Sequence, residues 1–136
     1  MAKFVAKDYS IEINSADFSS SLAAVTLSLS AEEQETTSFG SEYRQRISGL
    51  KDASISLDFH QDFGATAVDA TLYPLLGSEA TVVVKPTSDA IGSTNPGFSA
   101  VYLVTEYSPF DSSVGDLATL SVEWSIASGT VTRLEA

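Results

Sequence analysis

Apolar and polar residues alternate along much of this chain. The alternation is clearest in residues 9–13, 25–29, 55–59 and 120–126, where every second residue is Tyr, Ile, Val, Leu, Phe or Trp. A period of two places apolar side chains on one face of an extended strand and polar side chains on the other. Each of these stretches therefore predicts a half-buried β-strand.

Three further stretches predict strands without strict alternation. Residues 79–86 contain three consecutive valines, Val82 to Val84, which indicates a strand covered on both faces. Residues 100–107 are rich in Val and Tyr, and residues 129–134 predict a short last strand. The segments 88–97 and 108–115 carry the Gly, Asn, Pro and Ser residues that are typical of loops.

One segment, residues 65–76, has the apolar spacing of a helix instead. Its spaced apolar residues are Val68, Leu72, Leu75 and Leu76. Asp62 precedes the segment as a candidate helix cap, and Gly77 follows it as a stop signal. Pro74 predicts that the helix ends or tightens near Tyr73. The sequence thus predicts a mainly β domain over residues 1–136, a β-sandwich or partial barrel with one short flanking helix.

Composition narrows the possible functions of this domain. The chain has 136 residues, of which 43% are apolar, so a single core is expected. Its formal net charge of −11, from 18 acidic and 7 basic residues, disfavours binding to DNA or anionic lipid. No apolar run approaches the roughly 20 residues of a membrane helix, and the N-terminal stretch lacks the apolar core of a signal peptide. We expect a protein without membrane partners.

Candidate chemistry is sparse, so we expect neither an enzyme nor a cofactor. The absence of cysteine excludes disulfides, thiolate metal sites and a cysteine nucleophile. His60 is the single histidine, and its neighbours Asp58 and Asp62 share its strand face instead of converging on a nucleophile. No nucleophile elbow, phosphate-binding glycine loop or calcium loop occurs. A polar residue on a strand face is the favoured interpretation of His60.

Basic residues are concentrated in one hairpin-like segment, residues 31–52, which we call the arm. Three of the seven bases, Arg44, Arg46 and Lys51, lie there. Because Arg44 and Arg46 are two residues apart, a strand would project them from one face. We expect them to meet acidic residues of a neighbouring copy. The candidate acidic partners are Glu32, Glu33 and Glu35.

The polar faces of the predicted strands carry short hydroxyls, a few acids and almost no lysine. An exposed sheet more often carries longer charged residues. Such a face suits a surface past which another molecule slides without binding, although an ordinary Ser- and Thr-rich surface would look the same. The residues that we select from it are Ser54, Ser56, Asp58, Ser121, Glu123 and Ser125.

Taken in order, the segments of the chain resemble a known family. The resemblance is carried by "MAKFVAKDYSIEIN", "SADFSSSLAAVTLSLSAEEQETTSFG", "YRQRISGLKDASISLDFHQDF", "VDATLYPLLG", "VKPTS", "NPGFSAVYLVTEYSP" and "SVGDLATLSVEWSIASGTVTR". These segments are similar to the major tail tube proteins of long-tailed bacteriophages with non-contractile tails, especially the short ones of actinobacteriophages. The match runs nearly end to end, but it consists of fold-type patterns without a catalytic signature.

The resemblance implies a structural virion protein. Members of that family form sixfold rings that stack into a tube, and genome DNA passes through its channel without tight binding. It implies self-association as the main interaction, together with contacts to tape measure, terminator and distal tail proteins. It also implies a place in the phage tail, with assembly in the host cytoplasm.

The resemblance gives the two residue groups provisional roles. The arm would reach a neighbouring subunit with its bases and with the apolar residues Phe39, Tyr43 and Ile47. The selected hydroxyl and acidic residues would face the channel and repel phosphate. Two alternatives remain open: a tail terminator or head–tail joining protein, and a monomeric β-sandwich binding or decoration module. Trp124 alternates in phase with Val122 and Ile126, which indicates burial and disfavours a sugar-binding platform.

Overall fold

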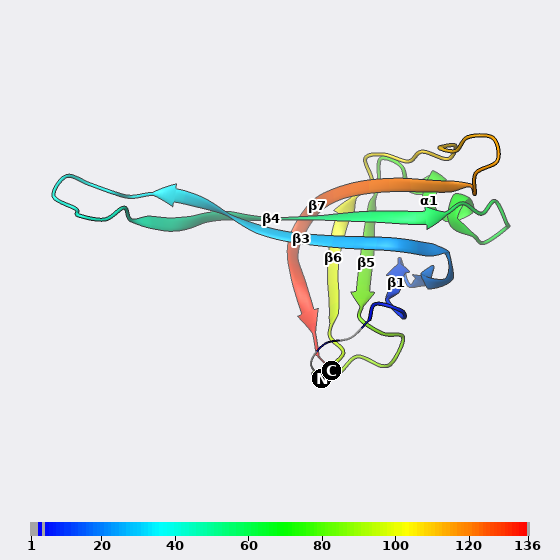
Figure 1. The fold of residues 1–136 in the computed structure, drawn as a ribbon, viewed down its shortest axis with the longest axis horizontal. Coiled ribbons are helices and arrows are strands. Elements are labelled where there is room, and N and C mark those ends of the chain that lie inside the picture. The colour runs from blue at the N-terminus through cyan, green and yellow to red at the C-terminus, as the bar shows by residue number, and fades with distance from the viewer. Residues whose placement is uncertain (1–2, 4, 136) are drawn as a thin grey trace.

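A computed structural model describes residue 3 and residues 5–135 of the chain (Figure 1). Its elements are β1 Ser10–Ile13, β2 Ala16–Asp17, a 3-10 turn Ser19–Ser21, β3 Leu22–Glu35, β4 Arg46–His60, α1 Val68–Leu75, β5 Glu79–Lys85, β6 Gly97–Leu103 and β7 Thr119–Leu134. The strands form one antiparallel sheet in the order β2-β1-β5-β6-β7-β4-β3.

Strand β7 connects the two halves of this sheet. Its residues 119–125 pair with β4, and its residues 125–134 pair with β6. After Ser125 β7 curves sharply (Figure 1), and its pairing with β6 contains register shifts and Gly129 at φ 73°. Bulges of this kind bend a strand and increase its twist. The sheet therefore curls over itself into a partial barrel, and β3 and β2 remain as its two edges.

The core lies inside this curl, on the apolar face of the alternating strands. In β4, Ile55, Leu57 and Phe59 are buried while the residues between them are only half-buried. Burial of each such side chain is worth about 1.5–3 kcal/mol. The mainly β fold with one flanking helix is therefore confirmed. The other strands supply Ile11, Ile13, Val82, Ala100, Tyr102, Leu120, Val122 and Trp124.

The valine run of β5 is covered less completely than its sequence indicates. Val82 is fully buried, but Val83 and Val84 are half-buried. Val83 lies on the outer face, where it and Ile91 both approach Gly97. Ile91, a loop residue, therefore lies near part of the second face of β5.

Helix α1 begins and ends later than the sequence predicts. It spans Val68–Leu75 and includes Pro74, with Val68 and Leu72 buried against the sheet. The proposed cap at Asp62 is wrong, because its side chain accepts the Gly64 N–H and only its backbone carbonyl accepts a helix N–H, that of Asp69. At eight residues α1 is far too short to cross a bilayer, and no other helix of the described residues could do so.

Candidate assembly surfaces

The arm is a two-stranded extension of β3 and β4 that projects from the body (Figure 1). The two strands stay paired out to Glu35 and Arg46, and residues 36–45 connect them. We call residues 36–47 the tip. Thr37 supports the tip because its hydroxyl accepts the Gln45 N–H at 2.8 Å. All residues of the arm are exposed except the half-buried Ser41. The arm therefore has no core of its own.

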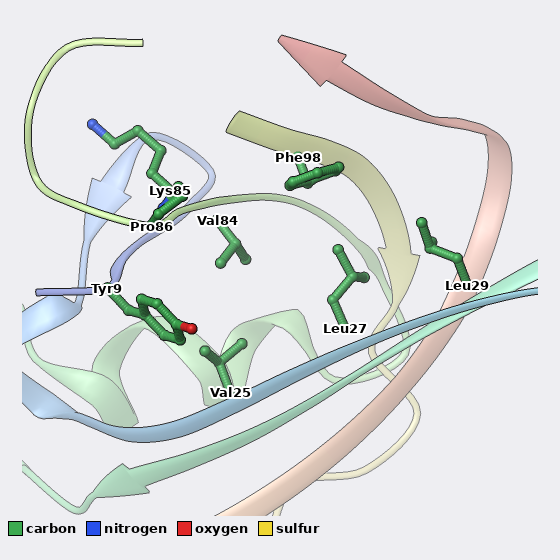
Figure 2. A pocket seen from close by; sticks show the side chains of 8 residues that line it. All are labelled: Tyr9, Val25, Leu27, Leu29, Val84, Lys85, Pro86 and Phe98. Atoms are coloured by element: carbon green, nitrogen blue, oxygen red, sulfur yellow. The ribbon is translucent and has the colours of Figure 1, made fainter. Parts of the chain in front are cut away.

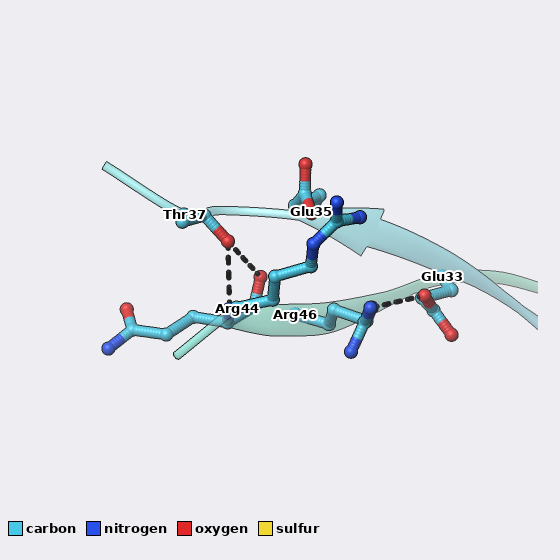
Figure 3. Close-up of polar contacts among 6 residues, drawn as sticks. Glu33, Glu35, Thr37, Arg44 and Arg46 are labelled. Carbon is cyan, nitrogen blue, oxygen red and sulfur yellow. Dashed lines mark hydrogen bonds and ion pairs between the residues drawn. The ribbon is translucent and has the colours of Figure 1, made fainter. Parts of the chain in front are cut away.

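The arginines of the arm have partners inside the same hairpin. Arg46 Nε lies 2.5 Å from a carboxylate oxygen of Glu33, and Arg44 lies 3.5 Å from Glu35 (Figure 3). In the single chain, Glu33 and Glu35 thus pair with arginines of their own hairpin. A contact between these glutamates and the arginines of another copy stays a prediction. Glu32 has no ion pair among the described residues and stays a candidate for such a contact.

The arm is also not the basic projection that its arginines suggest. Residues 31–52 contain five acidic and three basic residues, a net charge of −2. The positive charge is confined to the outer part, since residues 36–47 contain two arginines and one glutamate. Any attraction between the arm and an acidic surface must therefore act through its tip.

Large apolar side chains of the arm face solvent. Phe39 at the tip is fully exposed, and Tyr43, Ile47 and Leu50 are each at least 60% exposed. A bulge at Gly49 and Leu50 lets Ala31 pair with Lys51 and Glu33 pair with Ser48. A two-stranded hairpin without a covering layer is marginally stable in water. The apolar residues predicted for an intersubunit contact are therefore available for one.

A second apolar surface lies beside the edge strand β3. A groove of about 340 Å³ separates β3 from β5 and β6, the two sides of the open barrel (Figure 2). Sequence reasoning missed it, because the alternation of β3 predicts burial of residues that here are only half covered. It is lined chiefly by Tyr9, Val25, Leu27, Leu29, Val84 and Phe98.

The short polar residues selected from the sequence lie together on the outer face of the sheet. The strand register places Ser54 between Ser28 and Ser125 in one cross-strand row. In the next rows Ser56 neighbours Glu123 and Asp58 neighbours Ser121. This hydroxyl face, made by β3, β4 and β7, contains no Lys or Arg in these rows. Whether it lines a channel stays a prediction.

His60 ends the hydroxyl face and gives no sign of catalysis. It is half-buried opposite Thr119, and its Nδ1 is shielded from solvent without a hydrogen-bond partner in the described structure. Among residues 3 and 5–135, no three His, Asp or Glu side chains come close enough together to hold a metal ion.

A polar network fixes α1 and the segment after β6 to the end of β4. The Tyr107 hydroxyl donates to Asp69 at 2.5 Å, and Gln61 Nε2 donates both to that hydroxyl and to the Pro109 carbonyl. Burial, together with the bond to Asp69, raises the pKa of Tyr107 from 10 to about 12. The neutral hydroxyl is therefore the form that the fold stabilises.

This network predicts a pH-dependent loss of stability. The contribution of Tyr107 should be complete below pH 10, the unfolded-state pKa, and should vanish as the pH rises through about 12. Tyr107→Phe should lower the free energy of unfolding at pH 7 by about 1.5–3 kcal/mol, the value of a hydrogen bond to a charged group. Urea denaturation between pH 7 and 11.5 measures both effects. An equally steep alkaline decline in Tyr107→Phe would contradict the assignment.

Comparison with known proteins reveals similarity at the level of structure. No family model and no curated protein matches this sequence. A chain from the virion of a native gene transfer agent particle superposes with a TM-score of 0.76 and 19% identity, over 96% of this chain and 98% of that chain. A chain from the tail of an empty gene transfer agent particle, refined with helical C6 symmetry, gives a TM-score of 0.65 and 20% identity, over 82% and 81%.

These likenesses establish the fold. They extend over nearly the whole chain in the first case, at identities too low to carry an activity across. The partial barrel described above is thus a fold that occurs in chains of virion and tail particles.

Proposed function

We propose that this protein is a non-enzymatic subunit of a phage-type tail tube. In this proposal its copies form sixfold rings, and the rings stack around a channel that conducts DNA. The observation that carries it is the arm, a hairpin that leaves the body and exposes four large apolar side chains. The fold shared with chains of a virion and of a C6-symmetric tail supports it. Tape measure, terminator and distal tail proteins are the further partners of such a subunit, which assembles in the host cytoplasm.

The contact within a ring would use the edge of β3. This strand of 14 residues ends the sheet, so its outer backbone N–H and C=O groups have no strand partner among the described residues. An open edge of this length readily pairs with another chain. The apolar groove beside it would be covered at the same time, which supplies the hydrophobic part of the contact.

The hydroxyl face would line the channel. Its cross-strand rows offer short hydroxyls with the carboxylates of Asp58 and Glu123, and no cation that could hold a phosphate. An acidic wall repels the DNA backbone, so DNA would pass without being retained. Arg44, Arg46 and Lys51 lie on the arm and not on these rows.

Adding positive charge to the hydroxyl face tests this orientation. Ser54→Lys with Ser56→Lys should give tubes that retain DNA at low salt and release it as salt rises. Binding of a labelled single-stranded oligonucleotide to sedimented tubes measures the effect. Lysines at Ser99 and Thr132, paired on β6 and β7, provide the control. Equal binding by the unmodified tubes and by both variants would contradict a channel lined by the hydroxyl face.

Assembly itself is tested on the unmodified protein. Negative-stain microscopy and sedimentation velocity over a range of protein and salt concentrations should reveal rings and stacked tubes. Single rings that never stack would indicate a terminator or joining protein of the same fold. A monomer under every condition, including addition of preformed tube ends, would contradict self-assembly and favour a decoration module.

A further inference from the structure

A third apolar surface lies at the end of the molecule opposite the arm. Phe63 and Phe110 stack there with ring centroids 5.6 Å apart, and both rings are more than half exposed. Val114 and Leu117 are also exposed in the same loop, residues 104–118. We call these four residues the far-end patch. Figure 1 shows that this loop and the segment after β4 lie beyond α1, while the arm points the other way along the longest axis.

The far-end patch is held in place by hydrogen bonds. The Gln61 N–H donates to the Ala118 carbonyl at 2.9 Å. This bond joins the segment that carries Phe63 to the end of the loop that carries Leu117. Ser112 accepts the Thr119 N–H and closes the loop between them. The Tyr107 network fixes the other side of the loop to α1. The patch is therefore preformed, and a partner would meet an ordered surface.

Charge distinguishes the two ends of the molecule. Residues 60–76 and 104–119, which surround the far-end patch, contain five acidic and no basic residues. The tip of the arm, residues 36–47, carries a net charge of +1. Complementary charge of this kind sets partner choice and register across an interface. The tip is thus apolar like the opposite end of its own molecule. Its arginines pair with Glu33 and Glu35 but stay partly exposed, so they can also approach the acidic residues of that end.

We propose that the arm tip of one copy docks on the far-end patch of the next copy along the tube. Phe39 and Tyr43 would pack on Phe63 and Phe110, with Arg44 beside the surrounding carboxylates. In the structure the arm points away from its own far end, since the two lie at opposite ends of the molecule along its longest axis. A head-to-tail contact between unlike surfaces does not close on itself and generates filaments. This inference rests on the proposed function and names the contact by which rings would stack.

Site-specific cross-linking tests the contact, since the natural chain has no cysteine. Ser38→Cys places a thiol beside Phe39, and Ser113→Cys places one in the loop of the patch. A short bis-maleimide should link chains when the two single variants are mixed and co-assembled, and should leave each variant alone unlinked. The control mixture contains Ser38→Cys and Ser121→Cys, which lies on the hydroxyl face. These two variants should not be linked.

A second measurement separates stacking from ring formation. Phe39→Ser and Phe110→Ser should each raise the protein concentration needed for tubes by at least roughly 30-fold, as expected for loss of a buried aromatic anchor. Single rings should persist in both. Tubes that form normally without the mixed cross-link would overturn this inference and leave the proposed function intact. Failure of the unmodified protein to form any assembly would overturn both.

Discussion

Removal of the arm should abolish tube formation and leave a folded chain. The design replaces residues 31–51 with Asn-Gly, so that a tight turn joins Ser30 to its register partner Asp52. The free energy of unfolding should stay within about 1 kcal/mol of the full chain, because the deleted residues pair with one another, all but the half-buried Ser41 are exposed, and a shorter loop closes at lower entropic cost. Sedimentation should show a monomer or an isolated ring at every concentration. Circular dichroism and urea denaturation confirm folding. Stacked tubes from this chain would contradict both the proposed role of the arm and the head-to-tail contact.

A charge-reversed arm provides the matched comparison. Arg44→Glu with Arg46→Glu keeps the length and the apolar residues of the arm, but it breaks the pairs with Glu33 and Glu35. Each exposed pair is worth about 0.2–1 kcal/mol, so the body should remain folded. The negative tip should be repelled by the acidic far end. Assembly should therefore fail at low salt and recover as salt screens the repulsion. Unchanged assembly at low salt would show that the tip arginines play no part.

Replacement of Trp124 should have the largest effect on stability. The residue is fully buried in β7, and its indole N–H donates to the Glu106 carbonyl at 3.2 Å. Trp124→Ala should lower the free energy of unfolding by about 3–5 kcal/mol, through lost burial and the cavity left behind. Domains of this kind have only about 5–15 kcal/mol in total. Urea denaturation followed by circular dichroism measures the loss.

The control for this effect is an aromatic residue outside the core. Phe39→Ala removes a ring of similar kind from a fully exposed position and should change the free energy of unfolding by less than about 0.5 kcal/mol. Similar losses for both variants would mean that Trp124 does not anchor the core as described.

The strands could be predicted because burial on one face leaves a period of two in the sequence. Ile55, Leu57 and Phe59 alternate with polar residues, and each is buried as that pattern requires. The hydroxyl rows follow from the same alternation on the opposite face. The continuity of β7 could not be predicted, since Gly129 looks like a strand break. In the structure Gly129 lies in the irregular part of the β6 pairing, four residues after Ser125, where β7 exchanges β4 for β6.

Several side-chain contacts could not be predicted from the sequence pattern. Asp62 has the residue type of a helix cap, but the local turn at Gly64 takes its carboxylate instead. The pairing of Arg46 with Glu33 depends on the hairpin register, which a bulge shifts and which no local pattern encodes. Phe63 and Phe110 lie 47 positions apart in loops, where no periodicity marks them as neighbours. The sequence predicts the arm as a hairpin-like segment. Its three basic residues suggest a positive charge, but its five acidic residues make the net charge −2.

The dual pairing of β7 has a consequence for how the chain folds during synthesis. Neither half of the barrel is complete until residues 119–134 have left the ribosome, since β7 closes both β4 and β6. Pairings between residues so far apart in sequence form slowly, after the cost of closing long loops has been met. A nascent chain therefore has no finished surface on which another copy could grow. In the proposed tube, only chains whose residues 119–134 have been synthesised could be incorporated, so translation products that lack β7 would be kept out of the growing structure.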